Sequence, residues 1–427
     1  MTSPGKPMTF KAAILALCLA CAPAALHAAT IGKQTPAPPL TQPHIDANAP
    51  AAERAAWSAY LNRSQELMAA DKASFAAERA GLATIPEPAR AGNPNSMPLD
   101  RDAAWYGGAE AKAIAANILS YQTPAGGWSK NQNRADPPRQ RGQSYVQGTE
   151  GDSWSYVGTF DNDSTQTELA FLARMQKAYP GPEGDAYRAA FLKGVRYVLN
   201  AQYPNGAFPQ VYPLMGGYHD ALTFNDGGFA HQATFLRTIS ERKGDYAFIP
   251  PALAAEAATA LQKAMAVLLK SQVVVNGKKT VWGQQHDPIT LQPVGARNYE
   301  MKSLAAAESS GLLIFLMQQE NPSKEIRDAV HAGIAWLKDH AIMGYEWTNR
   351  NDGNGRMLYA KEGAGPLWSR FYDIETGKPI FGERDQSIFD TVADVGAGRR
   401  NGYSWYNSTP KSAIEMYDKT WKAKYPQ

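Results

Sequence analysis

The sequence predicts a mainly α fold, a toroid of paired helices joined by long loops, with a few short strands. Three observations support this prediction. Apolar residues recur at helical spacing through most of the chain. Four helix-like segments end in a Gln or His about 70 to 80 residues apart, at Gln122, Gln202, Gln272 and His340. Each of these ends is followed by a loop that contains glycine and an aromatic residue, so we expect a functional site where the loops gather.

Length and composition predict a folded chain with a balanced charge. The 427 residues include 43 Lys and Arg against 40 Asp and Glu, which leaves a net charge of +3. This balance excludes a strongly basic nucleic-acid-binding protein. Hydrophobic residues make up 44% of the chain, which excludes a disordered protein. We expect one large domain over residues 51–427 that acts as a monomer, without a nucleic-acid partner.

The N-terminus has the features of a signal peptide over residues 1–28. Two lysines precede an apolar run at residues 12–22, and Leu26-His27-Ala28 forms a small-residue cleavage site. The run is shorter than the roughly 20 residues of a transmembrane helix and is followed by Pro23, so we expect no membrane span. A lipoprotein signal ending at Cys21 is the alternative. Either way, the sequence predicts a protein exported to the periplasm or secreted, and cleavage after Ala28 would leave it without cysteine.

The rest of the chain divides into a leader and a series of helices. Residues 29–50 are rich in proline and alanine and have no apolar period, which predicts a mobile leader. Residues 51–82 show loosely helical spacing with no breaker before Gly81, which predicts one or two helices. Further expected elements are helices at 164–179, from 185 onward and at 229–242, and short strands near 279–281 and 357–360.

Absent motifs exclude several classes of enzyme. The chain contains no HExxH, no GxSxG, no GxxxxGK[ST] and no GxGxxG that opens a helix. Its seven histidines show no spacing typical of metal ligands. We therefore expect no zinc hydrolase, no serine esterase of the elbow type and no nucleotide-phosphate enzyme.

Two polar clusters lie just before predicted helices. The first, Asp161-Asn162-Asp163, offers hard oxygen atoms that suit Ca²⁺. A helix N-terminus with a capping box of Thr165 and Glu168 is the alternative interpretation. The second cluster contains Asn225 and Asp226, and a turn with an N-cap is its alternative. If both clusters face each other across the mouth of the toroid, they form a shared oxygen site.

Arginines and aromatic residues recur in the loops. Four arginines lie in glycine-bearing contexts, namely Arg297, Arg370, Arg384 and Arg400. Guanidinium groups held in tight turns beside aromatic rings suit the recognition of carboxylates, although a solvated surface arginine is the alternative for each. Together in one cleft they would attract an anionic ligand. Loop aromatics such as Trp128 either pack the loops onto the toroid or stack on sugar rings.

Eight ordered motifs resemble those of the family-10 pectate lyases, that is, of polysaccharide lyase family 10. They are GGWSKN, FDNDSTQTELAFLARM, YPNGAFPQVYPL, TFNDGG, WGQQHDPITLQPVGARNYE, WSRFYD, PIFGERD and RRNGYSWY. The resemblance spans residues 126–406, and Asn298 stands where we expect a small apolar residue. It implies a secreted bacterial enzyme with an (α/α) toroid and a single catalytic domain over residues 51–427. Its expected reaction is the cleavage of de-esterified polygalacturonate, the α-1,4-linked polymer in pectate, by β-elimination.

The resemblance also implies roles for individual residues. Arg297 matches the base of the family. Ca²⁺ would be held by Asp161 and Asp226, with Asn162 beside them. The residues that match substrate-binding positions are Arg370, Arg384, Lys130 and Arg400.

Elementary chemistry is consistent with these roles. The elimination removes the C5 proton, which becomes acidic when Ca²⁺ and arginines neutralise the charge that develops on the uronate. Deprotonating arginine at a pH about four units below its pKa costs about 5 kcal/mol. We expect nearby Ca²⁺ and arginines to lower the pKa of Arg297, and Lys130 is the alternative base. A glycoside hydrolase that uses Asp161 and Asp226, and a non-catalytic pectin-binding protein, are the alternative functions.

Overall fold

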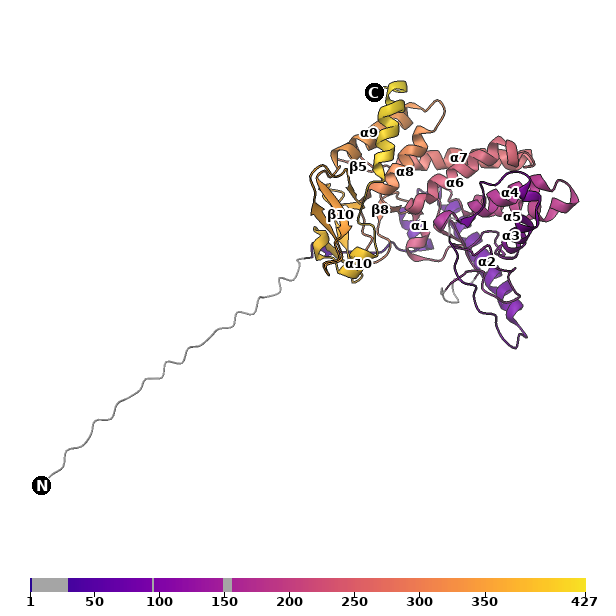
Figure 1. Ribbon diagram of the computed structural model, residues 1–427. Coiled ribbons are helices and arrows are strands. Elements are labelled where there is room, and N and C mark those ends of the chain that lie inside the picture. Colours follow the sequence, from indigo (N-terminus) through magenta and orange to yellow (C-terminus); the bar gives the residue numbers. More distant parts are fainter. Residues whose placement is uncertain (2–29, 94–95, 149–155) are drawn as a thin grey trace.

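The computed structural model describes residues 1, 30–93, 96–148 and 156–427, so residues 2–28 of the predicted signal peptide lie outside it (Figure 1). The described helices are α1 (Gln42–Asn48), α2 (Arg54–Arg79), α3 (Ala109–Ser120), α4 (Gln166–Ala178), α5 (Asp185–Ala201), α6 (Gly228–Glu241), α7 (Pro251–Ser271), α8 (Ala306–Met317), α9 (Lys324–Asp339), α10 (Ala397–Asn401), α11 (Pro410–Met416) and α12 (Lys422–Lys424). The described strands are β1 (Gly32–Lys33), β2 (Gly158–Thr159), β3 (Val211–Tyr212), β4 (Leu222–Thr223), β5 (Val274–Val275), β6 (Lys278–Lys279), β7 (Gln285–His286), β8 (Pro293–Val294), β9 (Leu304–Ala305), β10 (Tyr345–Asn349), β11 (Arg356–Ala360), β12 (Trp368–Ser369), β13 (Phe371–Tyr372), β14 (Phe381–Gly382), β15 (Ser387–Phe389) and β16 (Tyr406–Asn407).

Paired helices build most of the molecule, which confirms the predicted mainly α toroid. Helix α4 packs against α5, α6 against α7, and α8 against both α9 and α11 (Figure 1). In α5, Phe191, Val195 and Val198 fall on one stripe and are fully buried. Helix α7 is the one described helix that is long and apolar enough to cross a membrane, but it packs on α6 and α9 as a core helix does.

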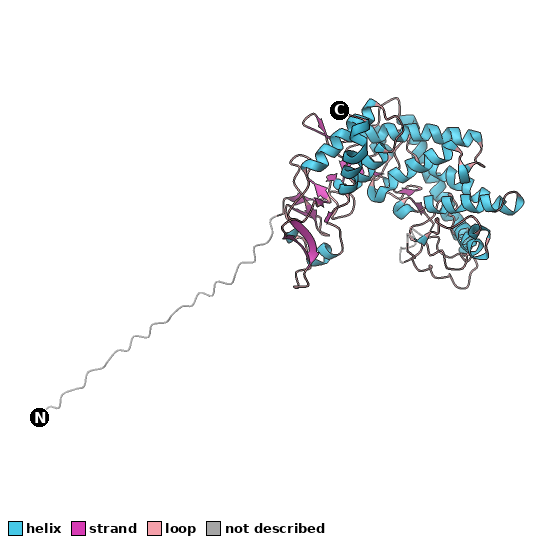
Figure 2. Ribbon diagram, turned by 45° about the horizontal axis from the view of Figure 1, so that its top comes forward, coloured by secondary structure: helices cyan, strands magenta, loops and turns pink. Residues whose placement is uncertain are grey.

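The strands form small sheets beside the helices rather than a closed barrel, as far as the described residues go (Figure 2). Strands β1, β15 and β14 form one sheet, and β4, β7 and β8 form another. The longest hairpin joins β10 to β11, and α10 lies against it. The strands expected near residues 279–281 and 357–360 are confirmed, because β6 and β11 lie there.

The repeated glutamines have one shared role. The side-chain amide nitrogen of each donates to a carbonyl of its own loop and to a carbonyl of a later helix, α5, α7 or α9. These six bonds are 2.8 to 3.1 Å long. His340 departs from this pattern, because its Nδ1 bonds to the carbonyl of Trp336 in its own helix at 2.8 Å. The glutamines therefore join each loop to the following pair of helices.

Residues 30–50 are part of the folded domain, so the prediction of a mobile leader is wrong. Strand β1 pairs with β15, and α1 begins at a Thr41 cap with proline in its first turn. Leu40 and Ile45 are buried in the main core. A segment without apolar periodicity can still pack on the domain when a few of its apolar side chains are buried in the core. Residues 54–79 form one continuous helix, α2.

The aromatic residues of the loops are buried, which settles their role as packing residues. Trp128, Trp282 and Trp405 expose none of their surface. The indole nitrogens of Trp128 and Trp282 donate to carbonyls near the ends of α3 and α7, at 2.8 and 2.9 Å. Stacking of these rings on a sugar, the alternative considered from the sequence, is therefore wrong. The site must instead be built from polar side chains at the loop surface.

Candidate active site

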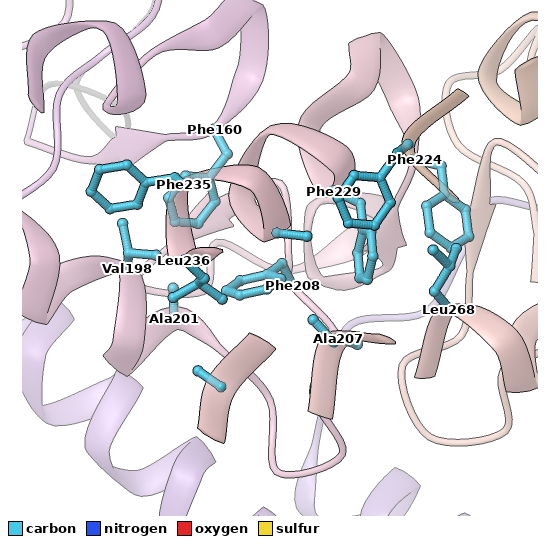
Figure 3. Packing of buried hydrophobic residues seen from close by; sticks show 14 of the residues in the cluster. Phe160, Val198, Ala201, Ala207, Phe208, Phe224, Phe229, Phe235, Leu236 and Leu268 are labelled. Atoms are coloured by element: carbon cyan, nitrogen blue, oxygen red, sulfur yellow. The ribbon is translucent and has the colours of Figure 1, made fainter. Parts of the chain in front are cut away.

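Two short 3-10 turns carry the acidic residues, and buried phenylalanines anchor both turns. Turn η4 (Asp161–Asp163) follows Phe160, and turn η7 (Asn225–Gly227) follows Phe224. Figure 3 shows both rings in the core, together with Phe208 and Phe229. The ring centroids of Phe160 and Phe208 are 6.2 Å apart, and those of Phe224 and Phe229 are 5.3 Å apart. Because the two turns also pack against each other, their polar side chains lie close together.

The turns require residues that tolerate left-handed backbone. Asn162 has φ = 52° and Asp226 has φ = 49°, and Asn and Asp adopt this conformation more readily than most residues. The capping box of Thr165 and Glu168 is present, with the Thr165 amide donating to Glu168 Oε2 at 2.8 Å. The capping-box interpretation is therefore confirmed, and the cap does not use Asp161, so the Ca²⁺ interpretation stays a prediction.

A pocket lies beside these turns, with Asp161 of the first turn and Asn225 of the second in its lining. It brings together Lys130, Asp161 and Arg297, three residues predicted from the sequence. Lys130 Nζ lies 3.5 Å from Asp161 Oδ2, and 43% of the Arg297 side chain is exposed. Further lining residues are Ser129, Val146, Val157, Thr159, Gln210, Val211, Tyr218, His219, Asn225, Gln284, Gln285 and Glu300.

Arg297 is held by a carboxylate within its own loop. Glu300 Oε2 accepts from Arg297 Nε at 2.9 Å and from its backbone N at 3.1 Å. Tyr403 OH donates to the other oxygen of Glu300 at 2.7 Å. Burial alone would lower the pKa of Arg297, but the charge of Glu300, the hydrogen bond to it and the nearby Tyr299 and Tyr403 together outweigh burial and raise this pKa. The expectation that its neighbours lower the pKa of Arg297 is therefore wrong for this chain's own residues.

Arg370 lies deeper, next to the second turn. Its Nη2 donates to Glu308 Oε1 at 2.8 Å and to Asn225 Oδ1 at 3.3 Å. The amide of Asn225 donates in turn to Asp226 Oδ2 at 2.7 Å. Only 15% of the Arg370 side chain is exposed. Arg370 therefore stabilises the wall that orients Asp226, and its Nη2 is not available to a substrate.

The acidic pair fits a divalent cation that is completed by another ligand. Withdrawal from solvent and then the nearby charge of Asp161 raise the pKa of Asp226. A cation between the two carboxylates would relieve this repulsion. Asn162 donates its amide hydrogen to Asn131 at 3.0 Å, so its carbonyl oxygen is the atom it can offer to a cation. Among the described residues, no group of three or more His, Cys, Asp or Glu is arranged for a metal. Asp161 and Asp226 alone thus make a weak site, since Ca²⁺ takes six to eight oxygens.

The two remaining predicted arginines differ from each other. Arg384 is exposed at the turn between β14 and β15, and its side chain makes no hydrogen bond to the described residues. Arg400 is buried and lies outside the pocket. Its nitrogens donate to backbone carbonyls, including that of Arg356 at 3.0 Å and that of Ala393 at 3.1 Å. The prediction that Arg400 binds substrate is not supported, because its guanidinium holds the β10–β11 hairpin and its neighbours together.

Sequence reasoning missed several residues of the site. Glu300 had a signal, since it follows Arg297 by three residues in the same motif. Tyr403 lies in the RRNGYSWY motif, but neither it nor Glu308 could be assigned to its arginine, because tertiary packing alone brings them together. His219 was also missed, and it lines the pocket. Burial, together with the positive charges of Lys130 and Arg297, lowers the pKa of His219 to about 4, so this imidazole is neutral at ordinary pH.

Comparison with known proteins identifies the family of the chain. The family described as pectic acid lyase matches residues 122–414. A solved structure, the family 10 polysaccharide lyase from Cellvibrio cellulosa, is 34% identical over 77% of this chain and 98% of that chain, with a TM-score of 0.63. A mutant family 10 polysaccharide lyase from the same organism, in complex with trigalacturonic acid, is 33% identical over 77% of this chain and 99% of that chain, with a TM-score of 0.63. No curated protein matches the chain.

Both solved structures are lyases that cover most of the chain, which decides against the hydrolase and the non-catalytic alternatives. The chain belongs to the pectic acid lyases, family 10 of the polysaccharide lyases, and is a pectate lyase.

Proposed function

We propose that the protein cleaves de-esterified polygalacturonate by calcium-assisted β-elimination, with Arg297 as the base. The observation that carries this proposal is the pocket in which Lys130, Asp161 and Arg297 meet, beside the turn that holds Asp226. A relative that binds trigalacturonic acid supports the choice of substrate. The signal-like N-terminus supports export, where such a polymer would be encountered.

Glu300 orients Arg297 for proton abstraction, because it binds the side of the guanidinium that faces away from the substrate. Glu300 occupies Nε and the backbone N, so the two Nη atoms are left to face a substrate. In the reaction one Nη takes the C5 proton, the C5–H electrons form the C4=C5 double bond, and the C4–O4 bond breaks. The departing O4 takes a proton from solvent. The raised pKa of Arg297 means that its neutral form is rare at ordinary pH. It also makes that neutral form a strong base, which the weakly acidic C5–H group requires.

The charged side chains around Arg297 would bind and neutralise the uronate. Asp161 and Asp226, with Asn162 beside them, would hold Ca²⁺, which supplies Lewis-acid polarisation of the substrate carboxylate when bound. Lys130 lies next to Asp161 and adds positive charge to the same wall of the pocket. Arg384 presents an exposed guanidinium suited to a substrate carboxylate.

The test is the ultraviolet absorbance of unsaturated products formed from polygalacturonate, with added Ca²⁺ and with chelator. We expect product with Ca²⁺ and loss of product with chelator. Arg297→Ala should abolish turnover, and Asp226→Asn should raise the Ca²⁺ concentration needed for half-maximal rate by at least about tenfold. Asp390→Asn, at an exposed aspartate, is the matched control. Normal turnover by Arg297→Ala together with loss in Lys130→Ala would assign the base to Lys130 instead.

A further inference from the structure

The loops that carry Arg297 and Arg384 lie directly against each other. The side-chain amide of Asn298 donates to the carbonyl of Arg384 at 3.0 Å, across 86 residues of sequence. A Cβ added to Gly382 would lie 2.5 Å from the carbonyl oxygen of Tyr299, so the two backbones touch there. The loop of the proposed base and the loop of the exposed Arg384 are therefore in direct contact.

A segment from the N-terminus, residues 31–37, bonds to one side of this contact. We call this segment the strap. The amide of Ile31 donates to the carbonyl of Ile388, and the amide of Gln34 donates to the carbonyl of Gln386, both at 2.8 Å. Lys33 Nζ donates to Ser387 Oγ at 2.8 Å. These bonds attach the strap to the strand that follows Arg384.

The same strap also bonds to the loop of Arg297. The side-chain amide of Gln34 donates to the carbonyl of Arg297 at 3.3 Å, and the amide of Ala37 donates to the carbonyl of Gly295 at 3.0 Å. Gln34 is only 4% exposed. A Cβ added to Gly295 would lie 2.1 Å from the Gln34 side-chain nitrogen, so the Gln34 amide keeps this position only while residue 295 is glycine.

We propose that Asn298 and the strap are positioning residues that fix the separation between Arg297 and Arg384. The inference rests on the proposed function, since it assumes that both arginines act on one polyuronate chain. Neither Asn298 nor the strap lines the pocket, so each would act through the loops. An error of about 1 Å in the placement of catalytic groups lowers the rate by about 100-fold. Hydrogen bonds that do not contact the substrate can therefore still determine the rate. The strap also lies outside residues 122–414, the part that matches the family.

The first experiment replaces the amide of Asn298 without changing its shape. Asn298→Asp removes the hydrogen donor and places a carboxylate against the carbonyl of Arg384. We expect kcat on polygalacturonate to fall about tenfold, with KM and the melting temperature close to wild type. Asn321→Asp, in the exposed turn between α8 and α9, adds the same charge elsewhere and should leave kcat unchanged. An unchanged kcat for Asn298→Asp, or a loss that follows a fall in melting temperature, would overturn the proposal.

The second experiment tests the strap through its closest approach. Gly295→Ala should lower kcat more than Gln34→Ala does, because the new methyl group collides with the Gln34 amide. The double variant should match Gln34→Ala within about twofold, since the collision is then removed. Additive losses in the double variant would show that the two residues act separately and that the strap does not position the loop.

A third measurement separates this inference from the proposed reaction. Amide hydrogen exchange of peptides over residues 383–388 should be faster in Asn298→Asp and in Gln34→Ala than in wild type. This result does not depend on turnover. If wild type forms no unsaturated product, the proposed function fails while the exchange rates still decide whether the loops are coupled. Unchanged exchange in both variants would refute the coupling.

Discussion

One oxygen of Glu300 accepts both from Nε of Arg297 and from its backbone N, at 2.9 and 3.1 Å. This contact orients the guanidinium toward the pocket and, against the effect of burial, raises its pKa. The same contact thus fixes the orientation of the proposed base and reduces the fraction of Arg297 that is neutral.

The rate should therefore increase with pH over an unusually wide range. Because the pKa of Arg297 is raised, its neutral fraction grows tenfold for each unit of pH throughout the accessible range. We expect kcat/KM to rise by about tenfold per unit between pH 7 and 10 at saturating Ca²⁺. Initial rates of unsaturated product formation measure this slope. A plateau within that range would point to a weaker base, for which Lys130 is the candidate.

Breaking the ion pair of Arg370 should destabilise the fold. Glu308→Gln leaves a guanidinium that is 15% exposed without its carboxylate, at 2.8 Å in the wild type. A buried charge that loses its partner costs about 3 kcal/mol in the free energy of unfolding. Urea unfolding measures this loss. The control is Glu256→Gln, which breaks the half-exposed pair with Arg196 and should cost less than about 1 kcal/mol. Equal losses in both variants would contradict the interpretation.

The repeated glutamines predict a second effect on stability. Gln272→Leu removes the donor to the buried carbonyls of Thr280 and Ala329, now bonded at 2.9 and 3.0 Å. The carbonyl of Thr280 then has no donor, whereas that of Ala329 keeps its bond within α9, so the free energy of unfolding should fall by about 1 to 3 kcal/mol. Gln318→Leu makes the same exchange at an exposed position and should be close to neutral. Thermal unfolding of the two variants side by side tests whether the hydrogen bonds matter or only the change in side chain.

A buried histidine should make stability depend on pH. His286 Nε2 accepts from the amide of Gly283 and its Nδ1 donates to the carbonyl of Leu291, so the ring is neutral. Burial lowers the pKa of His286 to about 4. The unfolded chain, with an ordinary pKa near 6.5, therefore takes up the proton first. His286 contributes up to about 3 kcal/mol to the free energy of unfolding. This contribution is complete above pH 6.5 and is lost as the pH falls to about 4.

A matched variant is needed to isolate this effect. Burial raises the pKa of both Asp71 and Asp220 to about 6, which changes stability in the opposite direction as the pH falls. The measurement is the difference in free energy of unfolding between wild type and His286→Asn at several pH values. The advantage of wild type should shrink between pH 6.5 and 4. A constant difference would show that His286 is not held neutral.

The sequence predicted the parts of the fold and site that depend on local chemistry. Gln122, Gln202 and Gln272 could be recognised because each satisfies a loop a few residues away. The turns at Asp161 and Asp226 were recognisable for a similar reason, since left-handed backbone and helix starts both select Asn, Asp and Thr.

Partners that are distant in sequence could not be predicted. Glu308 lies 62 residues from Arg370, and Tyr403 lies 103 residues from Glu300. No pattern of neighbouring residues in the sequence predicts these contacts. Arg400 shows the converse problem, because an arginine in a glycine-bearing loop binds backbone carbonyls as readily as it binds a substrate carboxylate. Only the tertiary structure distinguishes the two uses.

The hydrogen bond from Lys33 to Ser387 has a consequence for the order in which the protein assembles, since it spans 354 residues. Strand β1 finds its partner β15 only after nearly the whole chain has been synthesised and released. Contacts of such high sequence separation have a large entropic cost of loop closure and slow folding. The strap is therefore joined to the loop of Arg384 only once residues 386–388 have been synthesised, so it cannot hold that loop in a shorter chain.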